Sequence, residues 1–438
     1  MMKKVVLLLA GFSLLWLSND ARGGNAAFAA GSREVSDVIA STSDPPSEAP
    51  TGFDDLTNGL VDDATHAADK EAFDGAEDAD EGLGPLYNAQ ACRECHQAPV
   101  SGAASQITEI RIGHRDSRGN FVDPDIPMGD GTEVVHARSL LNDRSICPNK
   151  EFPDLTGQQR APASENVRAL RASLNTLGDG FIEAIPSAAL RAFADQQCRR
   201  TSGAICGKVI YVPVTEAGGS KRVARFGWKN QHASLLSFSA DAYLNEMGIT
   251  SVLQPTETAA LCDAIQDPED EIGDDGLGDV DRFARFMRAS KAPPRYASVA
   301  ASADGIAGSD LFDQVGCAIC HARTFTTAPA GSVLNAGTLV VSQAVGNKVI
   351  HPFSDFLLHD IGTGDGIVQN GGQGTANMLR TPPLWGLHVR GRMMHDLMSV
   401  SLEDAIGRHR GEASRVTSRY RALSEQDKQR LKVFLSSL

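Results

Sequence analysis

Two pentapeptides with the pattern Cys-x-x-Cys-His constrain this chain more than any other feature. They lie far apart, at residues 92–96 and 317–321. In an exported protein this pattern attaches a c-type haem: the two thiols bind the porphyrin, and the adjacent histidine coordinates the iron. The motifs therefore predict a dihaem cytochrome with two covalently bound haem c groups. The predicted attachment residues are Cys92, Cys95, Cys317 and Cys320, and the predicted proximal ligands are His96 and His321.

A redox-active dithiol and a zinc site are the alternatives to haem. A thioredoxin-like dithiol would need a surrounding βαβ pattern, which the sequence does not show. Zinc could use the two cysteine pairs, but the histidine that follows each pair would then have no role. Both alternatives explain fewer of the motif residues than haem attachment does.

The N-terminus has the features of an export signal. Residues 1–4 are basic, residues 5–17 are apolar, and residues 27–29 offer a small-x-small cleavage site. We expect a signal peptide over residues 1–29 and a periplasmic location. The apolar run is shorter than the roughly 20 residues of a membrane-spanning helix, so no span is expected after cleavage. An uncleaved N-terminal anchor is the alternative.

The charge of the chain limits its partners. The formal net charge is −14, and removal of residues 1–29 would leave about −16. Such acidity argues against nucleic acid and against anionic lipid as partners. It suits the docking of a small periplasmic electron donor, a cytochrome c or a cupredoxin.

Four cysteines remain outside the two motifs. In an oxidising compartment an even number predicts two disulfides, although four cysteines allow three pairings. The short segment between Cys198 and Cys206 favours a local bridge there, which would leave Cys147 to pair with Cys262. Buried free thiols are the alternative.

The chain divides at changes in composition. Residues 30–80 are rich in Ala, Ser, Asp, Glu and Gly and poor in large apolar residues, which predicts an acidic low-complexity tail that is disordered or loosely attached. Apolar residues at 280, 283, 284 and 287 predict a helix, and the two prolines at 293–294 end it. We therefore expect an N-terminal haem c domain over 81–292 and a C-terminal haem c domain over 293–438.

Helix signals outnumber strand signals. A helix is expected before the second motif, over residues 308–317, and a last helix should begin at Ser424 and carry an apolar stripe over 431–438. Strand signals are confined to residues 209–212 and 338–342. The predicted fold class is mostly α, with two cytochrome c-like haem domains, long loops and a few short strands.

The C-terminal segments at residues 379–387, 393–396 and 401–409 resemble the bacterial dihaem cytochrome c peroxidase and MauG superfamily. That superfamily has Thr-Pro-x-Leu-Arg, Pro-Tyr-x-His-Asp-Gly and Thr-Leu-Glu-Glu-Ala-Val segments, the last followed by an axial Met. The Met position falls on His409, so the resemblance implies that His409 is the sixth ligand of the second haem, opposite His321. The alternative for His409 is a solvated residue on a helix capped by Ser401. The competing ligands are Met393, Met394, Met398, His395 and His359.

The first domain resembles the same superfamily at residues 225–229 and 245–248. The resemblance implies that Trp228 relays electrons between the haems and that Glu246 is the acid–base group beside the first haem. The alternatives are an ordinary core tryptophan and a surface glutamate. His114, which lies 18 residues after His96, is the nearest equivalent of the superfamily's displaceable sixth ligand, and an open site is the alternative.

The resemblance is closer to one subfamily, the dihaem oxidoreductases often labelled thiol oxidoreductases. It is carried by residues 82–85, 180–186, 225–229, 247–250, 354–360, 380–386 and 409–413. At 393–397 the chain departs from the family's His-Asp-Gly-Arg.

The resemblance implies a peroxidase-like oxidoreductase acting on peroxide or another small oxidant, with electron entry at the C-terminal haem and chemistry at the N-terminal haem. It also implies a Ca²⁺ between the domains, near the carbonyls of Thr381 and Pro382. An electron-transfer cytochrome with two six-coordinate haems is the alternative function.

Overall fold

The computed structural model describes residues 33–128, 131, 133–148, 150, 153–154, 156–260, 262–263 and 265–438. The predicted signal peptide lies outside this range. Within the described residues, no helix has both the length and the apolar character needed to cross a membrane. The predicted domain boundaries at residues 80 and 292 stay predictions.

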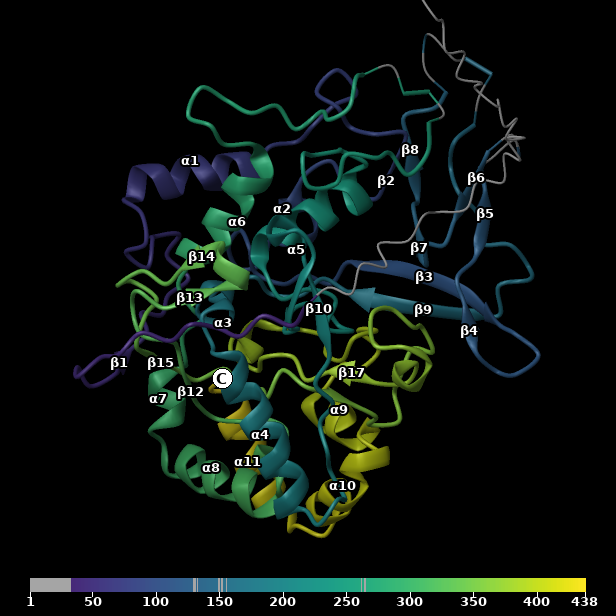
Figure 1. Cartoon of the computed structure of the whole chain (residues 1–438). Coiled ribbons are helices and arrows are strands. Elements are labelled where there is room, and N and C mark those ends of the chain that lie inside the picture. Colours follow the sequence, from purple (N-terminus) through teal and green to yellow (C-terminus); the bar gives the residue numbers. More distant parts are fainter. Residues whose placement is uncertain are drawn as a thin grey trace, which may run out of the picture. The chain divides into compact units, whose positions relative to one another are not determined.

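The described residues form short helices and many strands, with β3 to β9 in one run and α9 to α11 at the C-terminal end (Figure 1). The helices are α1 (Asp63–Asp74), α2 (Cys92–Cys95), α3 (Asp179–Glu183), α4 (Ser187–Arg200), α5 (Leu235–Ala242), α6 (Asp279–Ala289), α7 (Ala297–Ala300), α8 (Ala303–Val315), α9 (Leu402–Arg408), α10 (Ser414–Arg421) and α11 (Glu425–Leu435). The strands are β1 (Ser47–Glu48), β2 (Leu86–Tyr87), β3 (Thr108–Arg115), β4 (Phe121–Val122), β5 (Asp125–Pro127), β6 (Val134–His136), β7 (Leu140–Leu141), β8 (Arg144–Ser145), β9 (Val167–Ala172), β10 (Tyr211–Val214), β11 (Ser220–Val223), β12 (Phe325–Thr326), β13 (Val333–Leu334), β14 (Leu339–Val340), β15 (Lys348–Ile350), β16 (Leu358–His359) and β17 (Leu379–Arg380).

The predicted fold class holds only in part. The strands are short, as expected, but they are far more numerous than the two strand signals suggested, so the chain mixes α and β structure. The longest pairing joins β3 to β9 in an antiparallel register that sets Ile110 opposite Leu170. β4 and β7 also pair with β3 (Figure 1).

The N-terminal core is built around α6. Its apolar stripe, Val280, Phe283, Ala284 and Met287, is buried as the sequence predicted. The helix begins where the Asp270 carboxylate accepts a hydrogen bond from the backbone N–H of Asp279, at 2.6 Å. α1 and α5 both pack on α6.

The segment before residue 80 differs from its prediction. We expected a disordered or loosely attached tail, but α1 lies there and buries His66, Asp69 and Phe73. Asp69 is fully buried and forms two hydrogen bonds of 2.7 Å to Arg285 of α6. The acidic composition of this segment therefore did not predict the packed helix, because the buried Asp69 carboxylate is paired with Arg285 rather than solvated.

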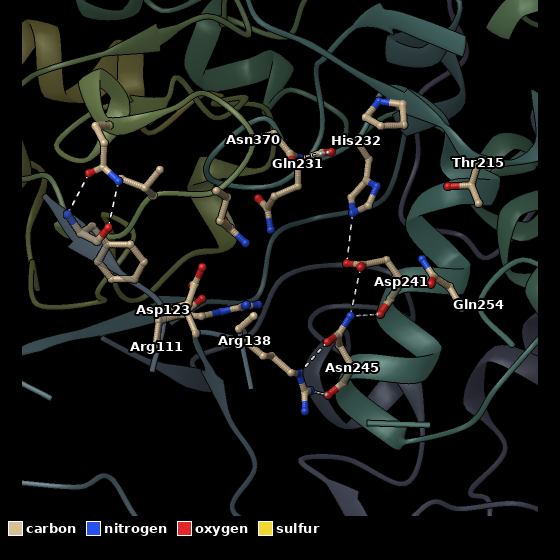
Figure 2. Close-up of a pocket in the computed structure, with 17 residues that line it drawn as sticks. Arg111, Asp123, Arg138, Thr215, Gln231, His232, Asp241, Asn245, Gln254 and Asn370 are labelled. Carbon is tan, nitrogen blue, oxygen red and sulfur yellow. Dashed lines mark hydrogen bonds and ion pairs between the residues drawn. The ribbon is translucent and has the colours of Figure 1, made fainter. Parts of the chain in front are cut away.

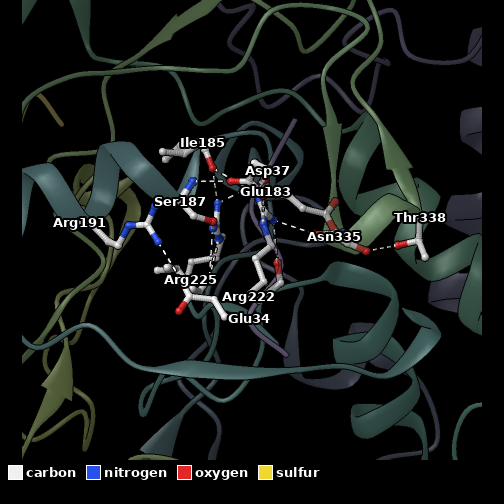
Figure 3. A network of polar contacts seen from close by, with 12 residues as sticks. Glu34, Asp37, Glu183, Ile185, Ser187, Arg191, Arg222, Arg225, Asn335 and Thr338 are labelled. Carbon is white, nitrogen blue, oxygen red and sulfur yellow. Dashed lines mark hydrogen bonds and ion pairs between the residues drawn. The ribbon is translucent and has the colours of Figure 1, made fainter. Parts of the chain in front are cut away.

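Further upstream, Asp37 enters a buried arginine network (Figure 3). Asp37 accepts a hydrogen bond from Arg222 at 3.1 Å and another from the backbone N–H of Ser187 at 2.7 Å. Arg225, which is fully buried, donates to the carbonyls of residues 182, 183 and 185. Through these hydrogen bonds the network joins the motif at 180–186 to the motif at 225–229.

The C-terminal core joins α8 and α11, which make extensive contacts. Phe312 and Phe434 are buried there, with ring centroids 5.3 Å apart. α11 begins after Ser424, whose hydroxyl accepts the N–H of Asp427 at 3.1 Å, as the sequence predicted. α8 ends at Val315, and the second motif follows directly.

Both predicted disulfides are confirmed. Cys198 is bonded to Cys206, and Cys147 is bonded to Cys262. The four cysteines of the two Cys-x-x-Cys-His motifs form no disulfide. Their thiols therefore stay available for haem attachment.

Candidate functional site

His321 and His409 face each other in the C-terminal part of the chain. Their ring centroids lie 6.4 Å apart. The Nδ1 of His321 donates to the Phe353 carbonyl at 3.0 Å, and the Nδ1 of His409 donates to the Ala405 carbonyl at 2.8 Å. Each hydrogen bond fixes the tautomer and leaves the Nε2 lone pair free, as is usual for histidines that bind a metal.

This spacing fits an iron between the two rings. Imidazole–metal bonds are about 2 Å long, so two imidazoles on opposite sides of one metal have centroids about 6 Å apart. Burial lowers the pKa of both histidines, that of His321 to about 4, so both rings are neutral at physiological pH. These residues fit a haem, which Cys317 and Cys320 would attach and which His321 and His409 would ligate.

Two of the competing ligand candidates, His359 and Met398, are less suited to this position. His359 is buried, and both of its ring nitrogens are bonded to carboxylates, Asp355 at 2.9 Å and Glu412 at 2.8 Å. Burial alone would lower the pKa of His359, but the Asp355 carboxylate outweighs it and raises that pKa well above its usual range. His359 is thus an imidazolium with no free lone pair. Met398 is 64% exposed.

The first motif lies on α2 and ends at His96. Burial lowers the pKa of His96 to about 4. Among the described residues, none forms a hydrogen bond with its buried Nδ1. The ring of Phe73 contacts that of His96, with centroids 6.3 Å apart. A neutral buried imidazole next to two free thiols fits a second haem at Cys92, Cys95 and His96.

Glu246 is placed beside this motif by a close backbone approach. It lies in the π-helical turn η2 (Tyr243–Met247), which ends at Gly248 with φ +75°. Gly84 packs so closely on Gly248 that a Cβ on Gly84 would overlap its carbonyl, which explains the glycines at both positions. The approach brings Asn88 to Glu246, and the Asn88 amide donates to the Glu246 carboxylate at 2.9 Å. π-helical turns are frequent at functional sites.

Glu246 is paired with a second carboxyl group rather than with a cation. Burial raises the pKa of Glu246, and the neighbouring Glu109 of β3 raises it further. Glu109 is itself held ionised by Arg111, which donates to it at 2.7 and 3.0 Å. Two such carboxyl groups side by side share a proton readily. Glu246 is therefore not the surface glutamate that the sequence left open.

A polar cavity of about 510 Å³ lies next to the arginine that pairs with Glu109 (Figure 2). Arg111 lines the cavity, as does Arg138, which donates to the side chain and the carbonyl of Asn245 at 2.8 and 2.6 Å. Sequence reasoning missed Asn88, Glu109, Arg111 and Arg138. No motif marks them, because they come together only through the β3–β9 pairing and the Gly84–Gly248 contact.

Trp228 is buried between segments of both predicted domains. Its indole N–H donates to the Ala172 carbonyl at 2.8 Å, and its ring packs with Leu379 and Leu397. The ring of His395 lies 6.0 Å from it, centroid to centroid. Trp228 is therefore a core residue, and its role as an electron relay stays a prediction.

The structure gives no support to His114 as a ligand of the first haem. It lies on β3, five residues beyond Glu109, with its Nδ1 bonded to Glu165 at 3.0 Å. Five residues of strand span about 16 Å, which carries His114 away from the first motif. His136, on β6, is a surface residue bonded to Asp125 at 2.7 Å.

Two thiol pairs with adjacent buried histidines define a protein of the dihaem class. A family model described as "Di-haem oxidoreductase, putative peroxidase" matches residues 163–438, more than half of the chain. The chain therefore belongs to this di-haem oxidoreductase family, and haem is the cofactor that the family implies. The match includes Trp228, Glu246 and the second motif; the first motif lies upstream of it.

No curated protein matches the chain. Among solved structures, a chain of Kuenenia stuttgartiensis hydrazine synthase pressurised with xenon aligns at 13% identity over 91% of this chain and 96% of that chain, with a TM-score of 0.38. A MauG-like protein associated with microbial copper homeostasis aligns at 18% identity over 36% of this chain and 52% of that chain, with a TM-score of 0.23. At these TM-scores neither likeness bears on function.

Proposed function

We propose that this protein is a periplasmic dihaem c-type oxidoreductase of peroxidase type. In this proposal the C-terminal site takes up electrons from a small donor protein, and the N-terminal site reduces peroxide or another small oxidant. The observation that carries it is the contrast between the two sites: His321 faces a second histidine, whereas the first motif is accompanied by a partly buried carboxyl pair.

The chain's own residues would divide the work as follows. Cys92, Cys95 and His96 would hold one haem. The other would be held by Cys317, Cys320, His321 and His409. A haem iron with an exchangeable coordination position binds peroxide and supplies electrons to it. The reduction of H₂O₂ to two waters consumes two electrons and two protons.

Glu246 is the proton-transfer group in this proposal. It would accept the proton from one peroxide oxygen and return it to the other, a task for which a carboxyl with a raised pKa is suited. Asn88 fixes the orientation of the carboxylate, and Glu109 shares its proton. Arg111, which pairs with Glu109, lines the polar cavity, and the solvent-exposed Asp123 lines it as well.

Peroxide consumption by the reduced dihaem protein tests the proposal. Replacing Glu246 by Gln should lower the rate about 10²- to 10⁴-fold, because the proton-transfer group is lost while the shape is kept. The exposed Glu271→Gln change should leave the rate unchanged.

The pH dependence of peroxide consumption provides a second test of Glu246. Glu246 must be ionised to accept a proton, and its raised pKa keeps it protonated at lower pH. The wild-type rate should therefore rise with pH through that raised pKa, and the Glu246→Gln rate should not. A protein that consumes no peroxide and whose haems are six-coordinate in both redox states would instead be an electron carrier.

A further inference from the structure

Four carboxylates gather outside the haem sites, on the loop between η2 and α6. They belong to Glu257, Asp263, Asp267 and Glu269, and one oxygen of each lies within 4.8 Å of the others. Two oxygens on opposite sides of a Ca²⁺ ion are about 4.6–5.2 Å apart, because each Ca–O bond is 2.3–2.6 Å long. The cluster thus has the dimensions of a calcium coordination shell.

A second observation sets this cluster apart from ordinary surface acids. Both carboxylate oxygens of Glu257 are fully buried and have no hydrogen-bond partner in the described structure, and the hydroxyl of Thr258 beside it is in the same condition. A buried, unpaired carboxylate costs several kcal/mol in free energy unless a cation or a proton neutralises it.

Nothing else in the described part of the chain supplies that neutralisation. No Lys, Arg or His there forms an ion pair with any of the four carboxylates. One oxygen of each of the four carboxylates lies within 4.8 Å of the others, so the four groups repel one another when they are ionised. A divalent cation would offset the repulsion among the four carboxylates. It would also give the unpaired Glu257 oxygens a partner.

We propose that Glu257, Asp263, Asp267 and Glu269 form a binding site for a divalent cation, of the size and oxygen-ligand chemistry that suit Ca²⁺. This site is distinct from the one that family resemblance placed at the carbonyls of Thr381 and Pro382. Mg²⁺ suits it less, because Mg²⁺ requires oxygens at 2.0–2.1 Å in near-octahedral geometry.

The cation would brace the turn that carries Glu246. The Thr250 hydroxyl donates to Asp267 at 2.7 Å, and the Thr250 backbone N–H donates to Glu269 at 2.7 Å. Thr250 lies only four residues after Glu246, and Glu269 also packs on Gly82. An ion that fixes Asp267 and Glu269 therefore fixes both segments that meet at Glu246.

Calorimetric titration of CaCl₂ into the chelator-treated dihaem protein tests the site. The double variant Glu257→Gln/Asp263→Asn should bind one Ca²⁺ fewer than the wild type, or bind it at least about tenfold more weakly. The matched variant Glu271→Gln/Asp274→Asn removes two exposed charges from the same segment and should bind as the wild type does. A calcium site at Thr381 and Pro382 would survive in both variants.

Thermal unfolding provides a second readout that does not depend on haem activity. Without calcium, Glu257→Gln/Asp263→Asn should melt at the same or a higher temperature than the wild type, since charge repulsion is relieved. With millimolar CaCl₂, the wild type and the matched variant should gain a few degrees, and the double variant should not. Equal calcium binding by all three proteins, equal loss in both variants, or no binding by the wild type would overturn the proposal.

Discussion

At the scale of single residues, the hydrogen-bond partner decides what each histidine can do. His359 is buried and His409 is half-buried, and both lie near the second motif. Carboxylates hold both nitrogens of His359, so it is a cation, whereas a backbone carbonyl holds only the Nδ1 of His409 and leaves its Nε2 able to bind iron. Sequence alone could not rank these two residues, because the Asp355 and Glu412 contacts are tertiary.

His409 can be tested by removing its ring. His409→Ala should leave the second haem with one protein ligand, so about half of the protein's haem should change from the low-spin to the high-spin spectrum. The reduction potential of that haem should change, and the first haem should keep its spectrum. The matched change is His351→Ala, whose side chain is 43% exposed and pairs with Glu48. Unchanged spectra in His409→Ala would show that another residue is the ligand.

At the scale of elements, the structures that local sequence patterns mark were predictable. Those that depend on contacts between distant parts of the chain were not. α6 and α11 follow from apolar periodicity and capping residues, and the Cys198–Cys206 bridge follows from its short span. β3 escaped prediction although polar and apolar residues alternate over 109–112. Its apolar positions do not mark one buried face: Ile110 is 41% exposed, whereas the polar Arg111 is buried and paired with Glu109.

α1 was missed for a related reason, and its pairing with α6 can be measured. Asp69→Asn leaves Arg285 without its buried partner charge. Because the Arg285 side chain is 29% exposed, water compensates in part, and we expect a loss of about 1–3 kcal/mol in the free energy of unfolding. Urea denaturation would measure it, with the exposed Glu71→Gln on the same helix as the control. Equal stability of both variants would mean that α1 contributes little to the fold.

At the scale of the whole molecule, the net charge of −14 bears on the choice of electron donor. A strongly acidic protein attracts basic partners over distances up to about one Debye length, roughly 10 Å at 0.1 M salt. The attraction raises the rate of encounter more than it raises the final affinity. The donor that we propose is therefore expected to be basic, and its recognition should be sensitive to ionic strength.

Stopped-flow reduction of the oxidised protein would test this expectation. With a basic cytochrome c as donor, the second-order rate constant should fall about tenfold or more as ionic strength rises from 10 to 200 mM, because salt screens the attraction. An acidic cupredoxin should react slowly at low salt and gain speed as salt is added, since the same screening then weakens a repulsion. A rate that does not change with salt for either donor would mean that the docking surface is not governed by the chain's net charge, and a faster reaction with the acidic donor would place electron entry at a locally basic surface instead.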